Sequence, residues 1–184
     1  MEKYIKTPIT EEISKNLHAG DYVFLSGTVY VARDAAHKRM TEAISRGEAP
    51  PFEMKDSVIY YMGPSPAREG QVIGSAGPTT ASRMDKYAPL LLDLGNRAMI
   101  GKGKRTKEVV DAMIRNRAVY FAAVGGAGAL ISKCIRKSEI VCYEDLGAEA
   151  VRKLEVENFP VVVVIDSEGK NLYETAAKEY AKKF

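Results

Sequence analysis

The sequence predicts a single α/β domain, residues 1–184, with a largely parallel sheet. Segments with the spacing of amphipathic helices alternate with short apolar segments rich in β-branched residues. The runs "AVYFAAV" and "PVVVVI" are apolar throughout, which is typical of strands buried on both faces. With 184 residues, 46% of them hydrophobic, the chain is long enough for one good core and short for two.

The first half of the chain predicts helices with recognisable starts and a bent strand between them. Thr10 and Asp34 are candidate N-caps, and Gly27 is expected to bend or bulge the intervening strand. Several short strands in this half hint at a second, antiparallel layer. The predicted elements are a helix at 10–17, a strand at 21–34, a helix at 35–46, strands at 57–62 and 71–76, and a helix from about Thr80 that is interrupted or restarted near Pro89.

The second half alternates more regularly between the two patterns. Thr106 is the candidate N-cap of a helix with one apolar face, and the glycines of "GGAGALISKCI" lead into another helix. The predicted elements are strands at 97–101, 118–124, 139–143 and 161–166, helices from Thr106, within 125–135 and at 148–156, a short strand at Leu172, and a closing helix from about Thr175.

Composition excludes several classes of function. A formal net charge of +3 does not indicate nucleic-acid binding, and the basic segment 101–107 has no interleaved aromatic residues. No apolar stretch approaches the roughly 20 residues that span a bilayer, and the N-terminus does not read as a secretion signal, so we expect a cytoplasmic protein. Cys134, Cys142, His18 and His37 fit neither a CxxC pair nor a zinc site, so this chain is not expected to hold a metal by itself, and both cysteines are expected to be reduced core residues.

Two candidate anion sites follow predicted strands. Arg33 ends a strand where a helix begins, and its guanidinium could grip a carboxylate in two places. In "GPTTASRMD", Thr79 and Thr80 begin a predicted helix and Arg83 lies one turn along. The alternatives are a surface arginine beside a capped helix, and a threonine that only caps.

A third candidate is the glycine-rich segment "GKGKR", where Lys102 or Lys104 could approach a ligand closely. The alternative is a solvated basic turn, because "GKGK" is not a phosphate-loop sequence. "VGGAGAL" matches a dinucleotide turn only loosely, since its third glycine would fall at Ile131. Together the three junctions would let one small dianion be held at both ends, which indicates a dicarboxylic acid.

Four segments occur here in the order and spacing of one family: "GDYVFLSGTVYVARDAAHKRM", "GPTTASRMDKYAPLLLDLGNRAMIGKG", "VGGAGAL" and "LEVENFPVVVVIDSEG". The chain resembles the β-subunit, or C-terminal domain, of class I iron-sulfur hydro-lyases, which comprise class I fumarate hydratase and L(+)-tartrate dehydratase. The resemblance implies a swivelling β/β/α three-layer domain that is active only beside an α-subunit. That partner would carry the three cysteines of a four-iron four-sulfur cluster, in an α2β2 assembly.

The resemblance also implies roles for individual residues. Arg33 and Arg83 would be carboxylate clamps, Thr79 the proton-transfer residue, and Lys102 a further carboxylate contact, with Lys104 as its alternative. His37, within the family's "RDxAH" pattern, and Thr80 would play supporting roles. The sequence leaves open whether the substrate is fumarate or tartrate, and whether the chain is instead a non-enzymatic carboxylate-binding module.

Overall fold

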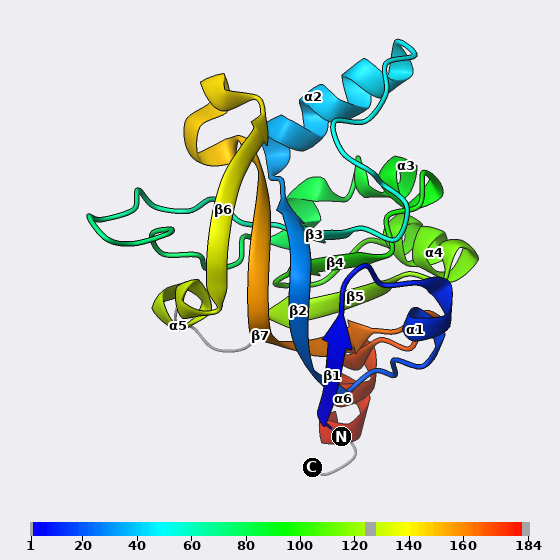
Figure 1. Ribbon diagram of the computed structural model, residues 1–184. Coiled ribbons are helices and arrows are strands. Elements are labelled where there is room, and N and C mark those ends of the chain that lie inside the picture. Colours follow the sequence, from blue (N-terminus) through cyan, green and yellow to red (C-terminus); the bar gives the residue numbers. More distant parts are fainter. Residues whose placement is uncertain (1, 124–127, 182–184) are drawn as a thin grey trace.

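The structure, a computed structural model, describes residues 2–123 and 128–181, in which helices alternate with strands (Figure 1). The strands are β1 (Glu2–Lys6), β2 (Tyr22–Val31), β3 (Val58–Tyr60), β4 (Ala98–Gly101), β5 (Val119–Ala123), β6 (Ile135–Cys142) and β7 (Val151–Ile165). The α-helices are α1 (Glu11–Lys15), α2 (Asp34–Ser45), α3 (Ala88–Asp93), α4 (Lys107–Asn116), α5 (Gly128–Lys133) and α6 (Leu172–Ala181), and the 3-10 helices are η1 (Ala81–Met84) and η2 (Glu144–Glu149).

The strands form one mixed sheet in the order β1-β2-β3-β4-β5-β7-β6. Strands β1 to β5 pair in parallel, each with the next, whereas β7 is antiparallel to β2, β5 and β6. Because β7 pairs with both β5 and β2, the sheet closes on itself in a barrel-like circuit. The predicted α/β class and mostly parallel sheet are confirmed, but the antiparallel part comes from β6 and β7 and not from the first half. The single-domain, three-layer swivelling arrangement stays a prediction.

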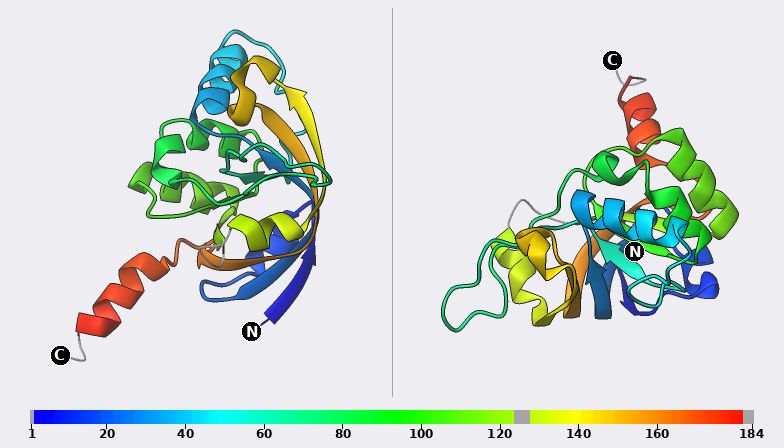
Figure 2. Two further views of the ribbon diagram at one scale, coloured as in Figure 1. Left: turned by 90° about the vertical axis from the view of Figure 1, so that its left-hand side faces the viewer. Right: turned by 90° about the horizontal axis from the view of Figure 1, so that it is seen from above.

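The continuous apolar runs arise because the central strands are buried on both faces. On β5, Val119 and Phe121 belong to one buried cluster and Tyr120 to another. The first cluster draws on β2, β3, β4, β5 and β7 and fills the strand circuit. The second packs the outer face against α2, α3 and α4, which lie together on one side of the curved strands (Figure 2). Alternating side chains therefore serve two cores.

The bend expected at Gly27 is confirmed. Gly27 has φ +114°, and the pairing of β2 with β7 shifts register between Leu25 and Gly27. A Cβ at this position would lie 2.4 Å from the Thr7 hydroxyl oxygen, so only glycine fits. β1, which pairs beside this part of β2, was missed because "EKYIK" alternates charged and partly buried residues over only five positions.

Several helix starts are as predicted, but two differ. Thr10 caps α1, accepting a hydrogen bond from the Ile13 amide. Asp34 is the first residue of α2 and Arg33 its N-cap, without a side-chain cap bond. The helix expected from Thr80 begins as a single 3-10 turn, η1, but the expected restart near Pro89 is confirmed, because α3 begins at Ala88 with a proline in its first turn. Neither Thr79 nor Thr80 caps it through a side chain, since Thr80 is the N-cap residue and forms no cap bond.

Three predicted elements are wrong. Residues 71–76 form no strand and belong to a long loop. The helix expected at 148–156 is instead the end of η2 and the start of β7, where Leu154 and Val156 are buried on one face. The glutamates and lysines there favour a helix locally, but pairing with β2 and β6 decides the outcome. The strand expected at Leu172 is the start of α6, which projects from the body of the molecule (Figure 2).

Residues 124–127, within "VGGAGAL", lie outside the described residues. In the remainder of the chain, no helix combines the length and the apolar character needed to cross a membrane.

Candidate active site

The three candidate segments meet at the carboxyl ends of neighbouring parallel strands, where α/β sheets commonly bind ligands. Arg33 lies two residues beyond β2. The Thr79 amide donates a hydrogen bond of 2.8 Å to the carbonyl of Tyr61, the residue after β3. Lys102, just beyond β4, donates its amide to the Thr79 carbonyl (3.3 Å) and accepts from the Ala81 amide (2.9 Å). The backbone thus places "GPTTASRMD" and "GKGKR" side by side.

The two arginines share a carboxylate. Arg33 Nε lies 3.6 Å from Asp34 Oδ1, and Arg83 Nη1 lies 3.8 Å from Asp34 Oδ2. Glu149 of η2 adds a second carboxylate, with Oε1 3.8 Å from Arg33 Nε. These distances are too long for hydrogen bonds, and among the described residues neither guanidinium donates one. Both arginines therefore lie near the Asp34 carboxylate, and their N–H groups remain able to donate to a ligand.

Gly63 allows the backbone to approach Arg33 closely. A Cβ at Gly63 would lie 2.7 Å from Arg33 Nη1 and 3.6 Å from the Ala148 carbonyl oxygen. A side chain at Gly63 would therefore displace the guanidinium from its place between α2 and η2.

His37 lies beneath Arg33 and is fully buried. Its Nδ1 lies 2.8 Å from the Arg33 carbonyl oxygen, which can only accept, so Nδ1 carries the proton. Burial lowers the pKa of His37 to about 4, so the ring is neutral at pH 7. Its edge packs on Tyr61, with ring centroids 5.4 Å apart, and Nε2 has no hydrogen-bond partner among the described residues. The ring can fix the Arg33 backbone, but it is not a cation that could bind an anion.

The buried neutral His37 predicts a loss of stability in acid. The pKa of His37 is about 4 when folded against 6.5 as a model value, so between these pH values the unfolded chain binds more protons. This contribution to stability is complete above pH 6.5 and falls by up to about 3 kcal/mol as the pH drops to 4. Urea unfolding of the wild type and of His37→Gln at pH 7 and pH 4.5 measures this change in the free energy of unfolding, which should be smaller in the variant. A pH dependence identical in the two proteins would contradict this assignment.

A buried ion pair lies under the same site. Arg105 Nε donates to Asp85 Oδ1 (2.7 Å), and the Thr106 amide donates to Asp85 Oδ2 (2.7 Å). The Arg105 guanidinium lies over the rings of Tyr61 and Tyr120, at 5.2 and 4.9 Å from their centroids. Its side chain is fully buried and that of Asp85 nearly so. The pair therefore joins the end of "GPTTASRMD" to the end of "GKGKR".

Two tyrosines hold the turn between the candidate lysines. The Tyr120 hydroxyl donates to the Gly103 carbonyl (3.0 Å), and the Gly103 amide donates to the Tyr173 hydroxyl oxygen (3.1 Å). Gly103 has φ +88°, a conformation that suits glycine. Both Lys102 and Lys104 are exposed, but only Lys102 is paired with the Thr79 backbone.

The structure brings together the predicted Arg33, Thr79, Arg83 and Lys102. Sequence reasoning missed the acids that position them, because it assigned Asp34 to a helix cap and gave no role to Glu149 or Asp85. The sequence did contain one indication of the Asp85–Arg105 pair: Asp85 is the last residue of "GPTTASRMD", and Arg105 is the last residue of "GKGKR".

The described residues do not fit an iron-sulfur cluster. No group of three or more His, Cys, Asp or Glu side chains in the described ranges could hold a metal ion. Cys134 immediately precedes β6 and Cys142 is its last residue, so the extended strand puts roughly 25 Å between them, whereas cluster thiolates must be adjacent. Both cysteines are free, as predicted, but they are only partly buried, so their placement in the core was wrong. Burial raises the pKa of both thiols.

Fold and site together define an α/β domain with arginine, lysine and threonine side chains gathered at the carboxyl ends of parallel strands. Residues 2–176 match the family described as "Fumarase C-terminus". The chain belongs to this family, as its sequence motifs indicated.

Three relatives show which kinds of protein this chain is similar to. "Fumarate hydratase 2" of Leishmania major is 42% identical over 156 residues, 84% of this chain and 28% of that protein. "Fumarate hydratase class I, aerobic" of Salmonella typhimurium is 41% identical over 152 residues, 82% of this chain and 26% of that protein. "Putative L(+)-tartrate dehydratase subunit beta" of Methanocaldococcus jannaschii is 36% identical over 187 residues, 98% of this chain and 96% of that protein. The chain thus spans little more than a quarter of these two fumarate hydratases and nearly all of the third relative.

Proposed function

We propose that this chain is the β-subunit of a two-subunit hydro-lyase that reversibly hydrates fumarate to malate in the cytoplasm. The observation that carries the proposal is the shared position of the four candidate side chains. Arg33 and Arg83 flank one carboxylate, and Thr79 is paired through its backbone with Lys102 at the same edge of the sheet. A small dicarboxylate needs such cations at both of its ends.

The proposed substrate-binding residues also contribute to the reaction. Hydration adds a hydroxyl group to one carbon of the double bond and a proton to the other, and dehydration removes that proton from a carbon next to a carboxylate. Arg33 and Arg83, with Lys102, would bind the carboxylates and stabilise the charge that develops on them, which is worth about 2–4 kcal/mol for a well-placed donor. Thr79 would transfer the proton, and His37 and Thr80 would support the site.

We further propose that an α-subunit completes the enzyme and holds the four-iron four-sulfur cluster, in an α2β2 assembly. Two observations support a partner. The Methanocaldococcus jannaschii relative of nearly equal length is named as a subunit beta, and the fumarate hydratases extend far beyond the matched region. Cys134 and Cys142, at the two ends of β6, lie too far apart to ligate a cluster together.

L(+)-tartrate is the second candidate substrate, with oxaloacetate as the product. The match to nearly the full length of the Methanocaldococcus jannaschii relative favours it. Tartrate and malate are both four-carbon dicarboxylates, so the same cations would bind either, and the additional hydroxyl would have to be recognised by other groups.

Co-expression with the cognate α-subunit, followed by anaerobic assays on fumarate, malate and tartrate, tests the proposal. We expect a stable complex with oxygen-sensitive turnover of fumarate and malate, and little turnover of tartrate. A clear preference for tartrate would establish the alternative substrate. Negligible turnover of all three by a cluster-loaded complex would contradict an enzymatic role and favour a carboxylate-binding module.

A further inference from the structure

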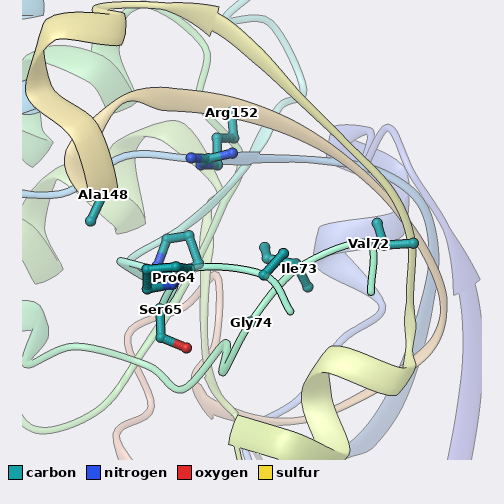
Figure 3. A pocket seen from close by; sticks show the side chains of 9 residues that line it. Pro64, Ser65, Val72, Ile73, Gly74, Ala148 and Arg152 are labelled. Atoms are coloured by element: carbon teal, nitrogen blue, oxygen red, sulfur yellow. The ribbon is translucent and has the colours of Figure 1, made fainter. Parts of the chain in front are cut away.

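A hollow of 340 Å³ lies beside the candidate active site, beneath the loop 63–77 (Figure 3). Its walls are mainly apolar, with Pro64, Val72, Ile73 and Ala148 among them, and Arg152 is the charged side chain that lines it. The volume is within the range of roughly 300–1,000 Å³ found for small-molecule sites, which are typically apolar with a few polar groups.

Arg152 has unused hydrogen-bonding capacity in this hollow. It lies on β7, opposite Val31 of β2 and Ile140 of β6. Its Nε is buried without a hydrogen-bond partner, and no carboxylate of the described residues lies within ion-pair distance. Figure 3 shows the guanidinium extending over the hollow toward Ala148 and Pro64. The side chain of Arg152 is only partly exposed, and its buried Nε lacks an acceptor that an anion in the hollow would supply.

The loop above the hollow is fixed at its neck. The Ser65 amide donates to the Ser75 carbonyl (3.1 Å), and the Ser75 amide donates to the Ser65 hydroxyl oxygen (2.7 Å). A Cβ on Gly74 would lie 2.1 Å from the Ser65 carbonyl oxygen, so the two arms of the loop are in close contact. The loop extends past β6 in Figure 1 without helix or strand of its own. Long loops of this kind often carry function.

We propose that this hollow binds a small monocarboxylate, with its carboxylate on the Arg152 guanidinium and its short apolar body against Val72, Ile73 and Ala148. A single arginine matches one carboxylate, which it can bind through two parallel N–H donors. The candidate active site, in contrast, has Arg33, Arg83 and Lys102 for a dianion. The Gly63 backbone lies against Arg33 and leads into the wall of the hollow at Pro64, so the two sites are adjacent, although Arg33, Arg83 and Lys102 do not line the hollow.

Methyl-labelled NMR of the full chain tests the proposal, with butyrate as the probe and uncharged butyramide as its neutral counterpart. We expect saturable shifts of the Val72 and Ile73 methyl signals with butyrate, and binding of butyramide weaker by about tenfold or more. Arg152→Met should weaken butyrate binding by a similar factor. Arg68→Met, which removes an exposed charge from the same loop, and Arg33→Met should leave these shifts unchanged.

The proposal is overturned by equal shifts with butyramide, by the absence of a saturable shift at Val72 or Ile73, or by undiminished binding by Arg152→Met. Loss of the shifts in Arg33→Met would assign the probe to the candidate active site and also reject this second site. The comparison of butyrate with butyramide uses the wild-type chain, so it does not depend on how well any variant folds. It is also independent of catalytic activity and of the proposed partner.

Discussion

Asp85→Ala is expected to lower the free energy of unfolding by about 3–5 kcal/mol, the usual cost of removing one partner from a buried ion pair. The substitution leaves the Arg105 guanidinium buried without its carboxylate and removes the acceptor of the Thr106 amide. Urea unfolding followed by circular dichroism measures the change. Because Asp85 joins η1 to the turn that carries Lys102, substrate binding should weaken as well.

Asp111→Ala is the matched control, since it also removes an aspartate from an ion pair but at the surface of α4. Its partner Lys107 is largely exposed, and such i,i+4 pairs contribute only about 0.3–0.5 kcal/mol. Asp85→Asn keeps the size of the side chain and removes its charge, so an intermediate loss of stability is expected. Equal stability of Asp85→Ala and Asp111→Ala would show that the buried pair does not hold the two loops together.

The sequence was most informative where local pattern and burial agree. "AVYFAAV" and "PVVVVI" have apolar residues at successive positions because each strand contributes side chains to two cores. The bulge at Gly27 could also be predicted, since a glycine among β-branched and aromatic residues of a strand often marks a bulge or a bend. These features depend on residues that are close together in the chain.

The incorrect predictions arose where distant pairing overrides local preference. The segment that begins β7 contains good helix formers, but β2 on one side and β6 on the other satisfy its backbone as a strand. The circuit closes only because β7 pairs with both β2 and β5, and no local pattern specifies such a pairing. The strand predicted at 71–76 is wrong because the apolar residues Val72 and Ile73 of the loop 63–77 line a hollow and not a sheet.

The same distinction applies to the candidate site. The sequence alone could assign Arg33 and Lys102 to the same edge of the sheet, because each follows a strand and the carboxyl ends of parallel strands share one edge. Their supporting partners could not, since Glu149 is distant in sequence from Arg33 and Asp85 is separated from Arg105 by α3 and β4. The functional assignment of the individual side chains stays a prediction that substitutions must test.

Thr79→Ala is expected to lower kcat of the cluster-loaded complex by about a hundredfold or more, with little change in melting temperature. The structure explains why kcat should fall while the melting temperature hardly changes. Within the described ranges the Thr79 hydroxyl forms no hydrogen bond, and the backbone bonds to Tyr61 and Lys102 do not need a side chain. Removing the hydroxyl should therefore leave the fold intact and affect only the proposed proton transfer. Steady-state kinetics on fumarate and malate, with iron content measured in parallel, give the result.

Ser82→Ala provides the control, because it removes an exposed hydroxyl from η1, three residues away, without touching the paired backbone. It should retain nearly full kcat. Thr79→Ser keeps a hydroxyl oxygen on the same carbon and should recover much of the activity that alanine loses. If Thr79→Ala with full cluster occupancy turned over as fast as Ser82→Ala, the hydroxyl could not carry the proton. Thr79 would then act only through its backbone, which holds Lys102 beside the end of β3.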